Sequence, residues 1–200
     1  VRKRPDTRAV EVDPVVRLHY VELTPPTIDD QRTDLVRLRE ALQDEWDIVD
    51  LTCDGAALAG LPGALIEGQW KITVAVREGN RLIAAWPGLR ERLFGLAIDI
   101  GTTTIAVTLC DLDTGNVVGE GGVMNPQIRF GEDLISRVSY IQLSPLGVRQ
   151  LTAVARKAIL RLAADTAADA GIELADIVEA TVVGNPIMHH IFLGLDPLGL

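Results

Sequence analysis

The sequence predicts an α/β protein in two parts: a small α+β module over residues 1–92 and a larger part with a mixed sheet over residues 93–200. A length of 200 residues fits one large or two small domains. Segments with the alternation of strands and segments with the spacing of helices occur in both halves, and Pro87-Gly88 separates the halves. Hydrophobic residues make up 48% of the chain and aromatic residues only 4%, so we expect a core of Val, Ile, Leu and Ala.

The first module is expected to begin with a strand and a helix. Residues 16–21 alternate between apolar and polar, as a half-buried strand does, and Pro25-Pro26 ends this pattern. Thr33 can cap the helix, because its hydroxyl oxygen can accept a hydrogen bond from an amide of the first turn. The apolar residues that share one face of this helix are Leu35, Leu38, Leu42 and Trp46.

A second helix and a hairpin complete the predicted module. The helix is expected between residues 55 and 67, interrupted or ended around Pro62. The hairpin strands are residues 71–76 and 81–86, joined by Gly79-Asn80, which is typical of a two-residue turn. No pattern in this module points to chemistry, which favours a spacer or a docking surface.

The second part is expected to hold three strands, two helices and a further strand. The three strands are predicted at about residues 94–101, 103–111 and 116–124. Gly131-Glu132-Asp133 precedes the first helix, and Ser144-Pro145 is a plausible start for the second, which Gly171 is placed to end. A last strand is predicted at residues 177–183.

The end of the first of these strands carries the most informative pattern in the chain. Asp99 lies between Ile98 and Ile100, and a carboxylate in an apolar run is costly unless something pairs with it. Gly101 is expected to adopt backbone angles that side chains forbid, and the amides and hydroxyls of Thr102, Thr103 and Thr104 can donate to phosphate oxygens. Asp99 can hold Mg²⁺, usually through water. The pattern therefore predicts a nucleotide phosphate site; the alternative is a buried hairpin whose turn contains Gly and Thr.

Four other places in the second part carry candidate functional residues. Gly184-Asn185 could present backbone and an amide to a phosphate or the attacking water, or it could be a plain turn into a helix. Asp133 or Glu132 could orient the attacking water as a catalytic residue, although favouring the N-terminus of the following helix is the simpler role. One of His189 and His190 is expected to face the core and make a hydrogen bond. Arg129 could meet phosphate or a partner, or simply make a surface contact.

Composition excludes several classes of partner. The net charge of −9 argues against nucleic acid and anionic membranes. No apolar run has the length of a membrane span and no signal peptide is visible, so a cytoplasmic location is expected.

The two cysteines, Cys53 and Cys110, cannot form a four-cysteine cluster site and are expected to be small buried residues. His19 is expected to be solvated on the polar face of its strand.

Residues 98–104 resemble the first phosphate loop of the actin, sugar-kinase and heat-shock ATPase superfamily. Two later segments, residues 124–137 and 183–190, narrow the resemblance to ATP-dependent reductive activators of corrinoid proteins. The resemblance implies a partial ribonuclease-H-like ATPase lobe over residues 93–200, after a middle or linker module. It implies catalytic roles for Asp99 and Asp133, with Asp99 also a metal ligand. The implied nucleotide-binding residues are Gly101, Thr102, Thr103, Thr104, Gly184 and Asn185.

The resemblance also implies cofactors and partners. It implies ATP with Mg²⁺, a [2Fe-2S] cluster in a ferredoxin domain before this chain, and a corrinoid protein whose Co(II) state is reduced at the expense of ATP. A homodimer is suggested. Since the second phosphate loop and the adenosine pocket would lie after Leu200, the chain is expected to be a fragment with little activity alone. A small-molecule kinase of the same superfamily and a non-enzymatic scaffold remain alternatives.

Overall fold

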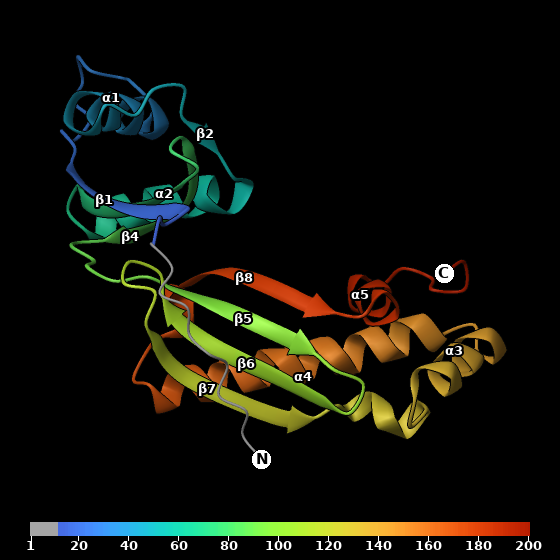
Figure 1. Ribbon diagram of the computed structural model, residues 1–200. Helices are drawn as coiled ribbons and strands as arrows, with labels where there is room; N and C mark the ends of the chain where they lie inside the picture. The colour runs from blue at the N-terminus through green and yellow to red at the C-terminus, as the bar shows by residue number, and fades with distance from the viewer. Residues whose placement is uncertain (1–11) are drawn as a thin grey trace. The chain divides into compact units, whose positions relative to one another are not determined.

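The computed structural model describes residues 12–200, which form two compact units, each with a four-stranded sheet and its own hydrophobic core (Figure 1). The first unit reaches Arg92 and takes in Leu112–Gly115. The second consists of Leu93–Asp111 and Asn116–Leu200. The α/β class predicted from the sequence is confirmed.

The sheet of the first unit has the strand order β1-β3-β4-β2. Its elements are β1 (Val16–Glu22), α1 (Asp34–Trp46), β2 (Thr52–Cys53), α2 (Gly55–Glu67), β3 (Lys71–Arg77) and β4 (Arg81–Pro87). The predicted cap of α1 is confirmed, because the side-chain oxygen of Thr33 accepts from the amide of Val36. Leu38 and Leu42 of α1 are fully buried, as its apolar face predicted.

Two local predictions in this unit are wrong, and one short strand was not predicted. Pro62 does not interrupt α2, because Pro62 and Leu58 are both exposed, so water can satisfy the carbonyl that proline leaves without a donor. The hairpin loop has three residues rather than two, since Arg77 pairs with Arg81. Strand β2 was not predicted, because a strand of two residues is too short to show an alternating pattern.

The environments of three side chains also differ from expectation. His19 is not solvated: its ring packs edge-on against Trp46, with 4.8 Å between ring centroids, and its Nδ1 is buried without a hydrogen-bond partner. Burial, followed by the charge of Arg17, lowers the pKa of His19. Cys53 and Cys110 are only half-buried, and that partial burial raises the pKa of both thiols.

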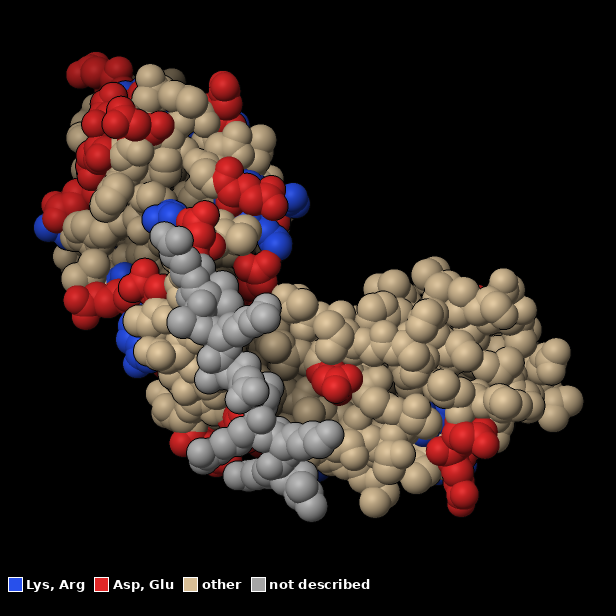
Figure 2. Space-filling model, viewed as in Figure 1, with Lys and Arg blue, Asp and Glu red and all other residues tan. Residues whose placement is uncertain are grey.

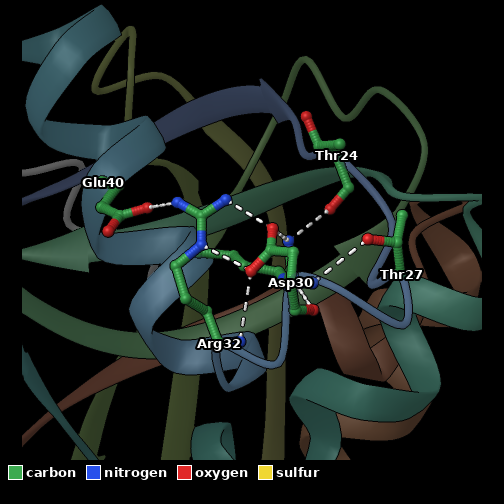
Figure 3. A network of polar contacts seen from close by, with 6 residues as sticks. Thr24, Thr27, Asp30, Arg32 and Glu40 are labelled. Atoms are coloured by element: carbon green, nitrogen blue, oxygen red, sulfur yellow. Dashed lines mark hydrogen bonds and ion pairs between the residues drawn. The ribbon is translucent and has the colours of Figure 1, made fainter.

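A polar network ties the loop before α1 to the helix (Figure 3). The carboxylate of Asp30 accepts hydrogen bonds from Arg32 and from Arg37, whose guanidinium also donates to the carbonyls of Thr24 and Asp30. Arg32 in turn contacts Glu40 of α1. The hydrogen bonds from Arg32 and then Arg37 hold the pKa of Asp30 far below its usual range, so the network is ionised at neutral pH.

The sheet of the second unit has the order β7-β6-β5-β8, with β5 and β8 parallel and the other pairs antiparallel. Its elements are β5 (Phe94–Ile100), β6 (Thr104–Asp111), β7 (Val117–Met124), the 3₁₀ helix η1 (Pro126–Phe130), α3 (Leu134–Leu143), α4 (Gly147–Asp169), the 3₁₀ helix η2 (Leu174–Asp176), β8 (Ile177–Gly184) and α5 (Pro186–Leu193). The predicted mixed sheet is confirmed. Gly171 ends α4 with a φ of 69°, as predicted, although α4 begins at Gly147 rather than at Ser144-Pro145.

Helix α4 covers one face of this sheet, where alternate residues of β5 and β6 such as Ile98 and Val107 are buried. The residues between them lie on the opposite, open face, where Ala97, Asp99 and Ala106 are exposed. No helix within residues 12–200 is both long and apolar enough to cross a membrane, and even the 23-residue α4 carries several charges.

Candidate functional site

Hydrogen bonds from Asn125 and Arg137 to three successive carbonyls hold the turn between β5 and β6. The Gly101 carbonyl accepts from Nδ2 of Asn125 at 2.8 Å, and the Thr103 carbonyl accepts from the Asn125 amide at 2.7 Å. The Thr102 carbonyl accepts from Nη2 of Arg137 at 2.5 Å. We call residues 101–104 the phosphate loop. The hydrogen bonds to the carbonyls of residues 101–103 fix the orientation of these three peptide groups.

The amides of the phosphate loop are available to a ligand. Within the described residues, the N–H groups of Thr102 and Thr103 donate to no protein acceptor, and the side chains of Thr103 and Thr104 are exposed. Successive free amides beside exposed hydroxyls form an arrangement that binds anions. The predicted donors of the loop are therefore brought together in the structure.

Gly101 is required for a different reason from the one predicted. Its φ is not in the positive range, so the backbone angles do not demand glycine. A Cβ at this position would lie 2.7 Å from the Thr104 carbonyl oxygen, to which the Gly101 amide donates at 2.9 Å. A side chain would therefore force this narrow turn open.

Asp99 lies next to last in β5, one residue before the loop begins to turn. Its side chain is on the open face of the sheet, between Ala106 of β6 and Val183 of β8 in the strand pairing. The expected cost of burying Asp99 is therefore absent, since the carboxylate meets solvent. Few charged side chains are visible on this face of the unit (Figure 2). Asp99 is thus an accessible carboxylate beside a turn with two free amides.

The second predicted segment lies at the same edge of the sheet. Gly184 ends β8 and pairs with Ile100, so Asn185 and Gly101 follow neighbouring parallel strands (Figure 1). Asn185 caps α5: its Oδ1 accepts from the Met188 amide at 3.0 Å. The turn-into-helix interpretation is thus confirmed for Oδ1, while Nδ2 of Asn185 donates to no group in the described chain.

The two histidines of α5 differ from the expectation of one core-facing, hydrogen-bonded ring. The ring that makes a hydrogen bond is His190, whose Nδ1 lies 2.9 Å from the Pro186 carbonyl. His189 has a buried Nε2 without a partner, and its Cδ2 would lie 3.5 Å from a Cβ built at Gly184. The hydrogen bond and the buried ring nitrogen therefore belong to different residues.

Asp133 caps α3. Its Oδ1 accepts from the Ser136 amide at 2.7 Å, and the Ser136 hydroxyl accepts from the Asp133 amide at 3.1 Å, which completes a capping box. The hydrogen bonds from Ser136 lower the pKa of Asp133. The capping interpretation is confirmed, and the catalytic role of Asp133 stays a prediction.

Three residues that support the loop received no role from the sequence: Asn125, Gln127 and Arg137. All three are fully buried. Gln127 donates through Nε2 to the Leu151 carbonyl of α4 at 3.1 Å, and its Oε1 accepts from Arg137 at 3.2 Å. Asn125 also caps η1 through its side chain. The sequence Asn125-Pro126 could have indicated this cap, because Asn at the N-cap followed by Pro is a common helix start.

Arg129 is an exposed residue of η1, and within the described chain it makes no hydrogen bond to residues 101–104. Its guanidinium stacks at 4.9 Å over the Phe130 ring, and it lines a groove of about 540 Å³ together with Met124, Lys157 and Arg161. This arrangement supports a surface contact for Arg129, and a contact with phosphate or a partner stays a prediction.

The possible metal ligands of this site fit a Mg²⁺ ion that is bound mainly through the phosphates of a nucleotide. They do not fit a metal ion whose ligands all come from the protein. Among the residues described, no three His, Cys, Asp or Glu side chains gather to hold a metal ion. Mg²⁺ commonly uses one or two carboxylates and completes its shell with water and phosphate oxygens, a role open to Asp99. A [2Fe-2S] cluster of the ferredoxin type does not fit, because it needs four cysteine thiolates and this sequence has two cysteines, Cys53 and Cys110.

Comparison with known proteins assigns the chain to a family. A family profile described as the RACo linker region matches residues 5–92, and one described as the RACo middle region matches residues 94–200. The chain belongs to the RACo family. The boundary between the two RACo regions coincides with the boundary near Arg92 between the compact units.

Two RACo relatives support this assignment. The chain is 31% identical over 196 residues to a protein from Eubacterium limosum named corrinoid activation enzyme RamQ, covering 94% of this chain and 32% of that protein. A solved structure titled reductive activator for corrinoid, iron-sulfur protein superposes with a TM-score of 0.75 at 36% identity, covering 96% of this chain and 31% of that one. The chain thus spans about a third of the length of these relatives.

Proposed function

We propose that this chain is part of an ATP-dependent reductive activator of a corrinoid protein, in which the second unit holds nucleotide phosphates. The observation that carries the proposal is the phosphate loop: three of its carbonyls accept hydrogen bonds from Asn125 and Arg137, and the amides of Thr102 and Thr103 are free. The names of the RACo relatives, which describe corrinoid activation, supply the biological setting.

In this proposal each residue of the site has a defined task. The amides of Thr102 and Thr103, with the hydroxyls of residues 102–104, donate to phosphate oxygens. Asp99 orients water molecules around Mg²⁺, which would neutralise charge on the phosphates. Gly184-Asn185, at the next strand end, offers the free Nδ2 group of Asn185 to the same ligand.

The chain would act by conformational coupling. ATP binding or hydrolysis would bias two states of the phosphate-binding unit, and this change would let an electron from a [2Fe-2S] domain elsewhere in the protein reach Co(II). The partner is then a corrinoid protein. A homodimer and a cytoplasmic location stay predictions.

The experiment is an ATPase assay of the full-length protein with and without a corrinoid protein in the Co(II) state from the same cell. The expected result is stimulated hydrolysis together with the spectrum of Co(I). Hydrolysis that ignores the corrinoid protein but follows an added small molecule would support a kinase. No response to either addition would support a scaffold.

Asp99→Ala is expected to lower ATP hydrolysis by roughly a hundredfold or more, because a group that positions charge at phosphates is removed. Its side chain is exposed, so the fold should survive. Glu120→Gln is the matched control, since Glu120 is an exposed acid two strands away on the open face, and we expect a change within about twofold. Equal turnover in Asp99→Ala and wild type would remove Asp99 from the site.

A further inference from the structure

Arg137 is the most unusual charged residue near the phosphate loop. Its side chain is fully buried, although arginine is almost never buried without a partner of opposite charge. In the described part of the chain, its guanidinium lies in no ion pair with a carboxylate. Its four acceptors are neutral: the carbonyls of Gly131 and Thr102, Oε1 of Gln127 and Sδ of Met188.

These contacts join the loop to its surroundings. Arg137 belongs to α3, Met188 to α5, and Gln127 to η1, and Gln127 continues to the Leu151 carbonyl of α4. The bond from Arg137 to the Thr102 carbonyl, at 2.5 Å, is the connection from this set to the middle of the loop. One guanidinium therefore links the loop to the segments that support it.

The neighbouring charges leave the guanidinium largely uncompensated. Asp133, the N-cap residue of α3, is the acid whose field reaches Arg137, but no hydrogen bond joins the two side chains, and Oδ1 of Asp133 accepts from Ser136. Burial lowers the pKa of Arg137 and Asp133 partly opposes that change. A buried cation that lacks a nearby anion is stabilised when an anion binds within a few ångströms.

We propose that Arg137 is a positioning residue that holds the Thr102 carbonyl inward, so that the loop amides face outward, and that its unpaired charge strengthens binding of a polyphosphate there. The claim that the charge of Arg137 strengthens polyphosphate binding rests on the proposed function. The claim that Arg137 positions the loop rests on the contacts alone.

Two variants of the full-length protein separate geometry from charge. Arg137→Lys keeps the charge but loses the planar fork that reaches several acceptors at once. Arg137→Gln removes the charge as well and leaves no buried cation. Arg149→Lys and Arg149→Gln are the matched controls, because Arg149 is an exposed arginine of α4 and makes no hydrogen bond to the loop in the described part of the chain.

The first measurement is amide hydrogen exchange without nucleotide. In both Arg137 variants we expect exchange at the amides of Gly101, Asn125 and Gln127, which donate hydrogen bonds within and next to the loop, to speed up at least about tenfold. The reason is that a charged hydrogen bond is lost, and exchange in α4 and β6 should not change. Unchanged exchange at the loop would overturn the positioning role. Loss of protection across the whole second unit in both variants would also overturn it, because Arg137 would then be a core residue with no selective effect on the loop.

The second measurement is steady-state ATP hydrolysis. We expect the KM for ATP to rise at least about tenfold in Arg137→Lys and further in Arg137→Gln, with kcat within about threefold of wild type. An unchanged KM, or an equal KM in the two variants, would overturn the charge contribution. Wild-type protein that fails to bind ATP would overturn both the proposed function and the charge contribution of Arg137. The exchange experiment would still decide the positioning role.

Discussion

Asn125 contacts the phosphate loop at two points, through Nδ2 at the Gly101 carbonyl and through its own amide at the Thr103 carbonyl. Its Oδ1 accepts from the Gln127 amide, so nearly all of the hydrogen-bonding capacity of the residue is used. A buried amide side chain with satisfied groups fixes one conformation, because any other arrangement leaves polar atoms unpaired. Asn125 is therefore a structural determinant of the loop, without itself facing a ligand.

Asp133 has two interpretations that one substitution separates. Ser caps helices about as well as Asp, whereas Ala does not. If Asp133 only caps α3, Asp133→Ser keeps ATP hydrolysis near wild type. Asp133→Ala then loses about 1 kcal/mol of local helix stability, seen as faster amide exchange at the start of α3. A large loss of hydrolysis in Asp133→Ser, with α3 still protected, would instead show that the carboxylate has a catalytic role.

His19 gives the first unit a pH dependence. Burial lowers the pKa of the folded-state imidazole below its ordinary value of 6.5, so the unfolded chain binds more protons in this range and stability falls as the pH drops through about 6.5. One proton contributes at most about 1.4 kcal/mol per pH unit. His19→Phe should keep the aromatic contact with Trp46 and flatten the dependence of amide protection in β1 between pH 7.5 and 5. An unchanged slope in the variant would contradict this assignment.

Strand β7 approaches α4 closely because of its glycines. A Cβ at Gly121 would lie 2.5 Å from Oγ1 of Thr166 and 3.0 Å from Cδ1 of Leu162, both on α4. Gly122 lies on the open face, where a Cβ would meet only the Ile105 carbonyl oxygen at 3.8 Å. The glycines thus set the distance between the strand and the helix.

Gly121→Val is expected to destabilise the second unit by about 1–3 kcal/mol, because the added atoms force α4 away from the sheet. Gly122→Val, the neighbouring control, should change the free energy of unfolding by less than about 0.5 kcal/mol. Denaturant unfolding followed by amide exchange in β6 and α4 measures both. Equal effects of the two substitutions would mean that close packing at Gly121 does not matter.

The strands of the second unit place the candidate site by topology. β5 and β8 are parallel neighbours, so the turn after Ile100 and the turn after Gly184 lie at one edge of the sheet. Ligands of open α/β sheets gather beyond the carboxyl ends of parallel strands. This explains why two short motifs separated by more than eighty residues belong to one candidate site.

Across the whole chain, each unit has its own core, and all the predicted nucleotide-binding residues lie in the second. The first unit is stabilised by its own sheet and by the Asp30 network. The chain covers about a third of its RACo relatives. Complete activity therefore stays a proposal for the full-length protein.

The sequence by itself determined the α/β class, the main strands, the cap at Thr33, the end of α4 at Gly171, and the turn after residue 100. These features follow from periodicity and from the local chemistry of Gly, Thr, Asp and Pro, which neighbouring residues express without distant contacts. Tertiary structure decided the rest. The exposure of Asp99, the packing of His19 and the buried position of Arg137 depend on which segments meet in space, and a single sequence does not reveal these long-range contacts.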